Sequence, residues 1–144
     1  MLVILASFEV IGRTVLDQKD SCFTGLLMSG IYENHDSADL KKLCDDYGKM
    51  IYYDYPTKHL APNQHTDTVN INEYGFRGPE ITQFKNENTY RVFLVGGSQT
   101  YGMFSTSDES TFSGYLQQKL DDLNADYKIE VINAGVNAYD SFTT

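Results

Sequence analysis

One serine and two glycine-bearing turns have the clearest potential for chemistry in this sequence. The turn Gly96–Ser98 (GGS) follows the apolar run Arg91–Val95, and the turn Asn133–Gly135 (NAG) follows a second run, Lys128–Ile132. A serine hydroxyl can attack an ester carbonyl, and backbone N–H groups that glycines leave accessible can hold the oxyanion that forms. A Gly-Gly-Ser turn without chemistry is the alternative that spacing alone leaves open.

Two strands joined by a helix must position these turns. The run Arg91–Val95 is typical of a strand buried on both faces of a parallel sheet, and Lys128–Ile132 predicts the second strand. Between them an amphipathic helix is expected over 112–123, with Gln117 on its solvent side. Its apolar face is formed by Phe112, Leu116, Leu120 and Leu123. This β-α-β order brings both turns to one edge of a parallel sheet, where α/β proteins bind ligands.

Other glycine-containing motifs fit this sequence poorly. Gly97 and Gly102 have the spacing of a phosphate-binding loop, but Met103 stands where that loop requires lysine. A Gly-x-Gly-x-x-Gly motif is absent, and the nucleophile elbow Gly-x-Ser-x-Gly fails at Thr100. The two cysteines and three histidines lack the spacing of zinc ligands. The sequence therefore predicts neither a cofactor nor a metal.

Three segments together resemble the SGNH (GDSL-like) hydrolases. The stretch Arg91–Gly102 (RVFLVGGSQTYG) is similar to the first block of that family, and Glu130–Tyr139 (EVINAGVNAY) is similar to the second. The stretch Asn72–Glu80 (NEYGFRGPE) resembles the segment that precedes the catalytic domain in a membrane-anchored or exported subgroup. One departure is Gly97, which replaces the aspartate of the Gly-Asp-Ser-Leu consensus.

The resemblance implies a fold and two functional residues. The fold would be flavodoxin-like, a three-layer α/β/α SGNH fold with a parallel sheet, of which only the first β-α-β unit is present here, preceded by an irregular α+β N-terminal segment. Ser98 would be the nucleophile and would also give its N–H to the oxyanion hole, and Gly135 would give a second N–H. The substrate would be a small-molecule, carbohydrate or lipid ester.

The catalytic base of that family has no counterpart in this sequence. The family takes an Asn donor and an Asp-x-x-His base from later blocks, whereas His35, His59 and His65 all precede Ser98 and none has an Asp three positions earlier. A serine without an adjacent base is a poor nucleophile. We therefore expect this chain to be an inactive front portion of a longer esterase.

Two alternatives to a truncated esterase stay open. The first is a non-catalytic carbohydrate-binding or assembly domain with the same fold, in which the aromatic run Tyr52–Tyr55 would stack on sugar rings. The second is a short protein that completes its sheet by forming oligomers.

The remainder of the chain predicts an N-terminal segment over 1–69 and the hydrolase part over 70–144. A helix is expected over Ser37–Tyr47 and a strand over Met50–Tyr55. Spacing does not decide whether Cys22 and Cys44 form a disulfide. The residue Arg77 could bind a substrate anion, or it could be structural, paired with a carboxylate such as Glu80 or bonded to loop carbonyls.

Charge and the first residues bear on partners and location. The 144 residues carry 20 Asp and Glu against 11 Lys and Arg, a net charge of −9, so no nucleic-acid partner is expected. The apolar run Met1–Phe8 is too short to span a membrane and has no basic residues before it. It is either a buried first element or the remnant of a membrane anchor over 1–12. Together with the resemblance, this favours an extracytoplasmic or membrane-anchored protein over a cytoplasmic one.

Overall fold

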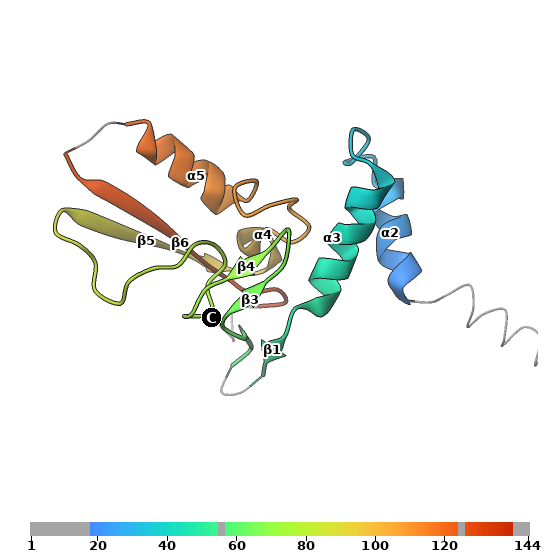
Figure 1. Ribbon diagram of the computed structural model, residues 1–144, viewed down its shortest axis with the longest axis horizontal. Coiled ribbons are helices and arrows are strands. Elements are labelled where there is room, and N and C mark those ends of the chain that lie inside the picture. The colour runs from blue at the N-terminus through green and yellow to red at the C-terminus, as the bar shows by residue number, and fades with distance from the viewer. Residues whose placement is uncertain (1–17, 55–56, 124–125, 140–144) are drawn as a thin grey trace, which may run out of the picture. The chain divides into compact units, whose positions relative to one another are not determined.

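The protein is a mixed α/β chain of two compact units, 1–45 and 46–144. The computed structural model describes residues 18–54, 57–123 and 126–139. Helix α2 (Gln18–Met28) and most of helix α3 (Ser37–Lys49) belong to the first unit, and all the strands belong to the second (Figure 1). The position 69/70, at which the sequence predicted the start of the hydrolase part, lies inside the second unit.

In its described part, the first unit is a pair of helices joined by a disulfide. The helix predicted over Ser37–Tyr47 is confirmed as α3 and extends to Lys49. The carboxylate of Asp36 accepts the N–H of Ala38 at 3.3 Å, which satisfies one of the free donors at the start of the helix. The cysteines Cys22 and Cys44 form a disulfide between α2 and α3, with 6.0 Å between their Cα atoms. The structure thus resolves the pairing that the sequence left open.

Four two-residue strands begin the second unit. Strand β1 (Tyr52–Tyr53) pairs antiparallel with β2 (His59–Leu60), and β3 (Gln64–His65) pairs antiparallel with β4 (Asn70–Ile71). Of the strand predicted over Met50–Tyr55, the structure confirms only Tyr52–Tyr53 among the described residues. Ile51 lies outside this strand: its N–H donates to the side chain of Gln64 at 2.6 Å, and its C=O accepts from both the Gln64 amide and the N–H of Ala61 at 3.0 Å.

A small apolar core lies beneath these strands. Met50, Leu60, Val69, Ile71 and Tyr101 are buried together, with Tyr47 and Tyr52 packed against them. Because Tyr101 lies just after β5 (Thr89–Gly96), this core joins the short strands to the β-α-β part of the unit.

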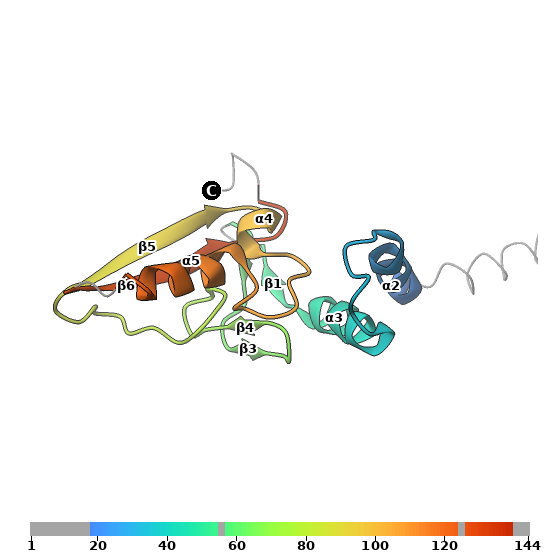
Figure 2. The same cartoon turned by 90° about the horizontal axis from the view of Figure 1, so that it is seen from above.

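Two long strands and one helix form the predicted β-α-β unit. Strand β5 (Thr89–Gly96) runs parallel to β6 (Lys128–Gly135), with Thr89 opposite Lys128 and Gly96 opposite Gly135. Helix α5 (Phe112–Asp121) lies over β6 (Figures 1 and 2). The side chain of Thr111 caps this helix by accepting the N–H of Gly114 at 3.1 Å. The three elements predicted from apolar spacing are therefore confirmed.

The burial predicted for these elements is wrong in two places. Strand β5 was expected to be buried on both faces, yet Phe93 and Val95 are exposed, because the described sheet has only two strands here and α5 covers β6. On the predicted apolar face of the helix, Phe112 and Leu123 are exposed rather than buried, and Leu123 lies beyond the end of α5 at Asp121. Conversely Gln117, which was expected to face solvent, bonds the outer edge of β6, since that edge offers unpaired backbone groups.

Candidate functional site

The serine singled out by the sequence begins a single helical turn. Helix α4 (Ser98–Tyr101) begins at the last residue of the predicted Gly96–Ser98 turn, just after β5. The extended residue Gly97 precedes the turn, and Gly102 ends it in the left-handed conformation, with φ of 78°. A Cβ at position 102 would lie 2.6 Å from Cγ2 of Thr111, so the site needs glycine for space as well as for conformation. This geometry places Ser98 at the carboxyl end of β5.

The structure brings the two predicted glycine-bearing segments together, but Asn133–Gly135, which was predicted to be a turn, is the last part of strand β6, because its backbone stays paired with β5 as far as Gly96. The two strands end side by side at Gly96 and Gly135, and the N–H of Val136 donates to the C=O of Gly96 at 2.9 Å. The turn α4 packs directly on the end of β6, where a Cβ on Gly135 would lie 2.7 Å from the carbonyl carbon of Thr100 and 2.8 Å from Cα of Tyr101. Only glycine permits this close contact.

A shallow cavity of about 360 Å³ lies beside Ser98. Ser98 is half-buried, and neither its hydroxyl nor its N–H donates a hydrogen bond to any described residue. The cavity is lined by Ser98, Gln99, Gly102, Met103, Phe104, Ser105 and Phe112. Phe104 has a φ of 62°, which is unusual for a bulky side chain and is a form of strain that often accompanies functional sites. The cavity thus offers apolar walls and two hydroxyl groups.

The second predicted donor, the N–H of Gly135, already has a partner. It donates to Oδ1 of Asn133 at 3.1 Å. The Asn133 side chain is buried and is held at its other end, because its Nδ2 donates to Oγ of Ser113 at 2.9 Å and to the C=O of Tyr101 at 3.4 Å. A substrate oxyanion would therefore have to share this N–H with Asn133. The sequence did not predict that the Asn133 side chain occupies this N–H, although Asn133 lies only two positions before Gly135.

None of the three histidines lines the cavity beside Ser98. Nδ1 of His59 lies 2.7 Å from the C=O of Thr57, and Nδ1 of His65 lies 3.3 Å from Oδ1 of Asn70. The third, His35, belongs to the first unit and is exposed. The two histidines of the second unit therefore give Ser98 no adjacent base.

Arg77 is a structural residue that bonds the carboxyl end of α4. Its side chain is 1% exposed and pairs with Asp108, whose side chain is 14% exposed, at 2.8 Å. The N–H groups on Nη1 and Nη2 of the same guanidinium donate to the Tyr47 hydroxyl at 2.7 Å and to carbonyl oxygens at 2.7 to 3.4 Å. Those carbonyls belong to Thr68, Tyr101, Gly102 and Ser107.

The carboxylate partner of Arg77 is therefore Asp108, not Glu80, which instead accepts the N–H of Glu73 at 3.1 Å. Because every guanidinium nitrogen is bonded within the protein, Arg77 has no free donor for a substrate anion, and of the two roles left open by the sequence the structure favours the structural one. The sequence could not identify Asp108, which lies 31 positions away in a loop.

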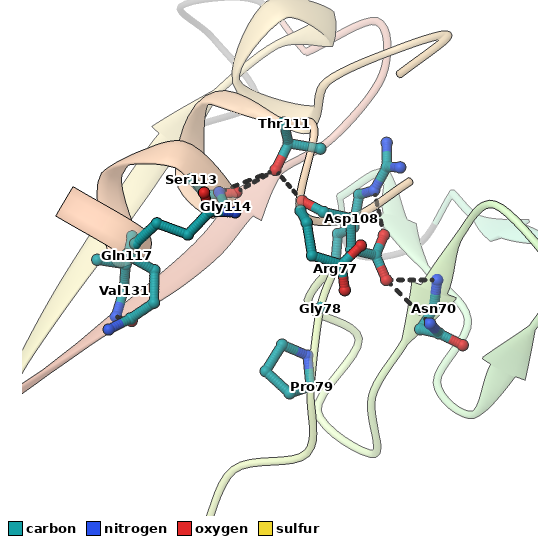
Figure 3. Close-up of a pocket in the computed structure, with 12 residues that line it drawn as sticks. Asn70, Arg77, Gly78, Pro79, Asp108, Thr111, Ser113, Gly114, Gln117 and Val131 are labelled. Atoms are coloured by element: carbon teal, nitrogen blue, oxygen red, sulfur yellow. Dashed lines mark hydrogen bonds and ion pairs between the residues drawn. The ribbon is translucent and has the colours of Figure 1, made fainter. Parts of the chain in front are cut away.

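A second cavity, of about 290 Å³, lies at the start of α5 (Figure 3). Its acidic group Asp108 lies between Arg77 and Asn70, and Asn70 donates to it through both its backbone N–H at 3.1 Å and its side-chain amide at 3.0 Å. On the other wall Thr111 and Ser113 bond each other through their hydroxyls at 2.8 Å. These bonds join the loop around Asn70 and Arg77 to the start of α5, so this part of the cavity wall is a structural junction.

Tyr101 carries a buried hydroxyl behind the site. Its side chain is fully buried, and its hydroxyl makes no hydrogen bond to a described residue. Burial, together with the nearby Tyr52, raises the pKa of this hydroxyl well above that of free tyrosine. Tyr101 is therefore a neutral core residue. Of the two described tyrosines in the predicted aromatic run, Tyr52 packs against the core and only Tyr53 is exposed.

Within the described ranges, no three His, Cys, Asp or Glu side chains group closely enough to hold a metal ion. No helix in the part of the chain that the structure describes is long and apolar enough to cross a bilayer. The apolar run Met1–Phe8 and residue Tyr55 lie outside the described residues. Comparison with models of known protein families finds no match, and comparison with curated proteins finds no significant match.

Proposed function

We propose that this chain carries the nucleophile of an SGNH-type serine ester hydrolase. The observation that supports the proposal is a half-buried Ser98 whose hydroxyl and N–H bond no described residue, at the start of a helical turn that follows a parallel strand. In this proposal β5, α5 and β6 are the first β-α-β unit of a three-layer α/β/α fold. The substrate is a small-molecule, carbohydrate or lipid ester, and its acyl group lies against the apolar walls of the cavity beside Ser98.

The reaction would proceed by acyl transfer to Ser98. Its Oγ attacks the ester carbonyl carbon while a base takes the hydroxyl proton, and the carbonyl oxygen becomes an oxyanion held by the N–H groups of Ser98 and Gly135. The base then gives the proton to the leaving alcohol, and water hydrolyses the acyl-serine. Because no histidine lines the cavity, the base in this proposal is a histidine outside these 144 residues.

Two measurements with p-nitrophenyl acetate test the nucleophile. The 144-residue chain should hydrolyse this ester no faster than its Ser98→Ala variant, because it lacks an adjacent base. In the protein expressed from the complete native gene, Ser98→Ala should lower kcat/KM by at least about 10³-fold. Ser105→Ala is the matched control, since Ser105 lies in the same cavity and should be dispensable. Full activity of the Ser98→Ala protein would exclude Ser98 as the nucleophile.

A non-catalytic carbohydrate-binding or assembly domain with the same fold is the second candidate. It is favoured by the lack of a histidine beside Ser98 and by the bond that already occupies the Gly135 N–H. Titration with neutral oligosaccharides, followed by nuclear magnetic resonance, would distinguish the two functions. Binding would be supported over hydrolysis if the oligosaccharide shifts resonances near the exposed Tyr53, if Tyr53→Ala abolishes those shifts, and if Ser98→Ala binds the oligosaccharide as the wild type does.

We further propose that the protein functions outside the cytoplasm. The disulfide between Cys22 and Cys44 supports this location, because disulfides persist mainly in oxidising compartments. Protein extracted from its native cells under denaturing conditions without reductant should resist maleimide labelling. Labelling at both cysteines would contradict the proposed location.

A further inference from the structure

Three large apolar side chains converge on the cavity beside Ser98. Met103 and Phe104 come from the loop after α4, and Phe112 is the first residue of α5. We call these three residues the apolar wall. Met103 is 38% exposed and Phe112 is 63% exposed, so much of the wall is open to solvent. Accessible apolar side chains that meet from separate segments at one cavity are typical of a ligand site.

The fold holds Phe104 in this wall against its backbone preference. Its φ of 62° lies in the left-handed region, which a bulky side chain disfavours. The ring packs against the ring of Tyr47, with 5.0 Å between the centroids, and the Tyr47 hydroxyl is bonded by Arg77 at 2.7 Å. Because its support is fixed in this way, the wall is formed before any ligand arrives.

The nucleophile requires this cavity to stay open. Ser98 lines the same cavity as the apolar wall, and an ester must reach its hydroxyl. Other segments of a longer protein therefore cannot fill the cavity without blocking the reaction. The occupant that remains is the ester itself, an argument that rests on the proposed hydrolase function.

Of the two halves of an ester, the acyl group suits the apolar wall. The base that takes the proton of Ser98 also returns it to the leaving oxygen, so the alcohol lies on the side from which the base approaches. The described residues that line the cavity include no acid, base or charged side chain. The acyl chain therefore extends along this wall, away from the base.

We propose that the hydrolase prefers esters of straight-chain aliphatic acids longer than acetic acid, and that contact of the acyl chain with Phe112 determines this preference. An acetyl group offers the wall only its methyl group, whereas a hexanoyl chain offers several methylenes. Each methylene that leaves water for an apolar contact is worth roughly a fourfold gain. Because the cavity is shallow and covers a chain only in part, we expect hexanoate esters to exceed acetate esters by at least about tenfold in kcat/KM.

A series of p-nitrophenyl esters measures this preference in the protein expressed from the complete native gene. Acetate, butyrate and hexanoate esters share one leaving group, so their kcat/KM values compare acyl chains. Phe112→Ala should lower the ratio of hexanoate to acetate by at least about fivefold. This ratio does not depend on the fraction of protein that is folded. Leu123→Ala is the matched control, since Leu123 is 64% exposed but lies past the other end of α5, and it should leave the ratio unchanged.

Ethyl and hexyl acetate, assayed by the release of acetate, test whether the alcohol takes the place of the acyl chain. The longer alcohol should bring no gain that Phe112→Ala removes. The inference is overturned if the gain follows the alcohol chain, if hexanoate is no better than acetate, or if Phe112→Ala leaves the ratio unchanged. In each of these cases an inactive Ser98→Ala protein would leave the proposed nucleophile standing, whereas a fully active one would remove the proposed function itself.

Discussion

Replacing Arg77 with methionine should remove much of the stability of the second unit. Methionine keeps an unbranched apolar stem but has no charge and no donor. The guanidinium that it replaces holds Asp108 at 2.8 Å and the carbonyl oxygens of Tyr101 and Gly102 at 3.2 and 2.7 Å. In the variant Asp108 would keep only its two bonds from Asn70, and the C=O of Tyr101 only the 3.4 Å bond from Asn133.

The magnitude follows from burial. With side chains 1% and 14% exposed, Arg77 and Asp108 are screened little by solvent. Removing one partner of a buried ion pair costs about 3–5 kcal/mol, and because Asn70 still donates to Asp108 in the variant, the lower end of that range applies. We therefore expect Arg77→Met to lower the free energy of unfolding by at least about 3 kcal/mol. Arg77→Lys keeps the charge but loses the fork of donors, so its loss should be smaller.

Urea unfolding measures this loss, followed by circular dichroism and tyrosine fluorescence, since the chain has no tryptophan. Lys119→Met is the control, because Lys119 and Asp122 form an ion pair at 3.9 Å with side chains 81% and 74% exposed. Adding Asp108→Asn to Arg77→Met should cost less than the sum of the two single changes. The reasoning is refuted by an Arg77→Met protein that is no less stable than the Lys119→Met control.

Four further predictions concern titration, the disulfide and packing. The hydrogen bond from Arg91 lowers the pKa of Glu130 in the folded protein. The ionised Glu130 therefore stabilises the fold above the unfolded-state pKa of about 4.3, and this contribution is lost as pH falls through the lower folded-state pKa. In urea unfolding, Arg91→Met should make stability less dependent on pH in this acid range. Burial raises the pKa of Tyr101, so its stabilisation is lost as pH rises above about 10, and Tyr101→Phe should flatten this alkaline decline. Reducing the Cys22–Cys44 disulfide, which spans 22 positions, should destabilise the α2–α3 pair by about 2–4 kcal/mol in thermal melts, and the Cys22→Ser/Cys44→Ser double variant should not respond to reductant. Gly135→Ala should cost about 1–3 kcal/mol in urea unfolding because its Cβ would lie 2.8 Å from Cα of Tyr101, whereas Gly25→Ala, with no atom within 4 Å, should not destabilise.

The elements with local apolar patterns could be predicted from the sequence. Strands β5 and β6, helix α5 and helix α3 were identified because the spacing of their apolar residues is a property of neighbouring positions. The single turn α4 could not be found in this way, since four residues give no period. The burial of β5 was overestimated for a related reason: an apolar run shows that a strand can be covered, but in the described residues Phe93 and Val95 stay at least half exposed, although the ring of Phe76 packs against Phe93.

The contacts that hold the candidate site together could not be predicted. Arg77 and Asp108 are 31 positions apart, and Gln117 bonds a strand that follows its helix, so only the assembled fold brings these groups into contact. In the same way, the sequence offered the Gly135 N–H as a donor without showing that Asn133 already accepts it. A spacing indicates which backbone groups are present at a turn, but their partners depend on the side chains that the fold packs around them.

The helical turn that carries Ser98 is bonded at its carboxyl end, whereas the donors at its amino end have no described partner. Arg77 and Asn133 bond the C=O of Tyr101 at the carboxyl end of the turn, whereas the N–H and hydroxyl of Ser98 at its other end bond no described residue. A donor fixed from behind needs no reorganisation when negative charge develops in front of it, which is the arrangement that stabilises an oxyanion best. The Gly135 N–H differs, because Asn133 is anchored at its other end by Ser113 and cannot turn away without breaking that bond. In the proposed hydrolase the oxyanion therefore depends more on the N–H of Ser98 than on that of Gly135.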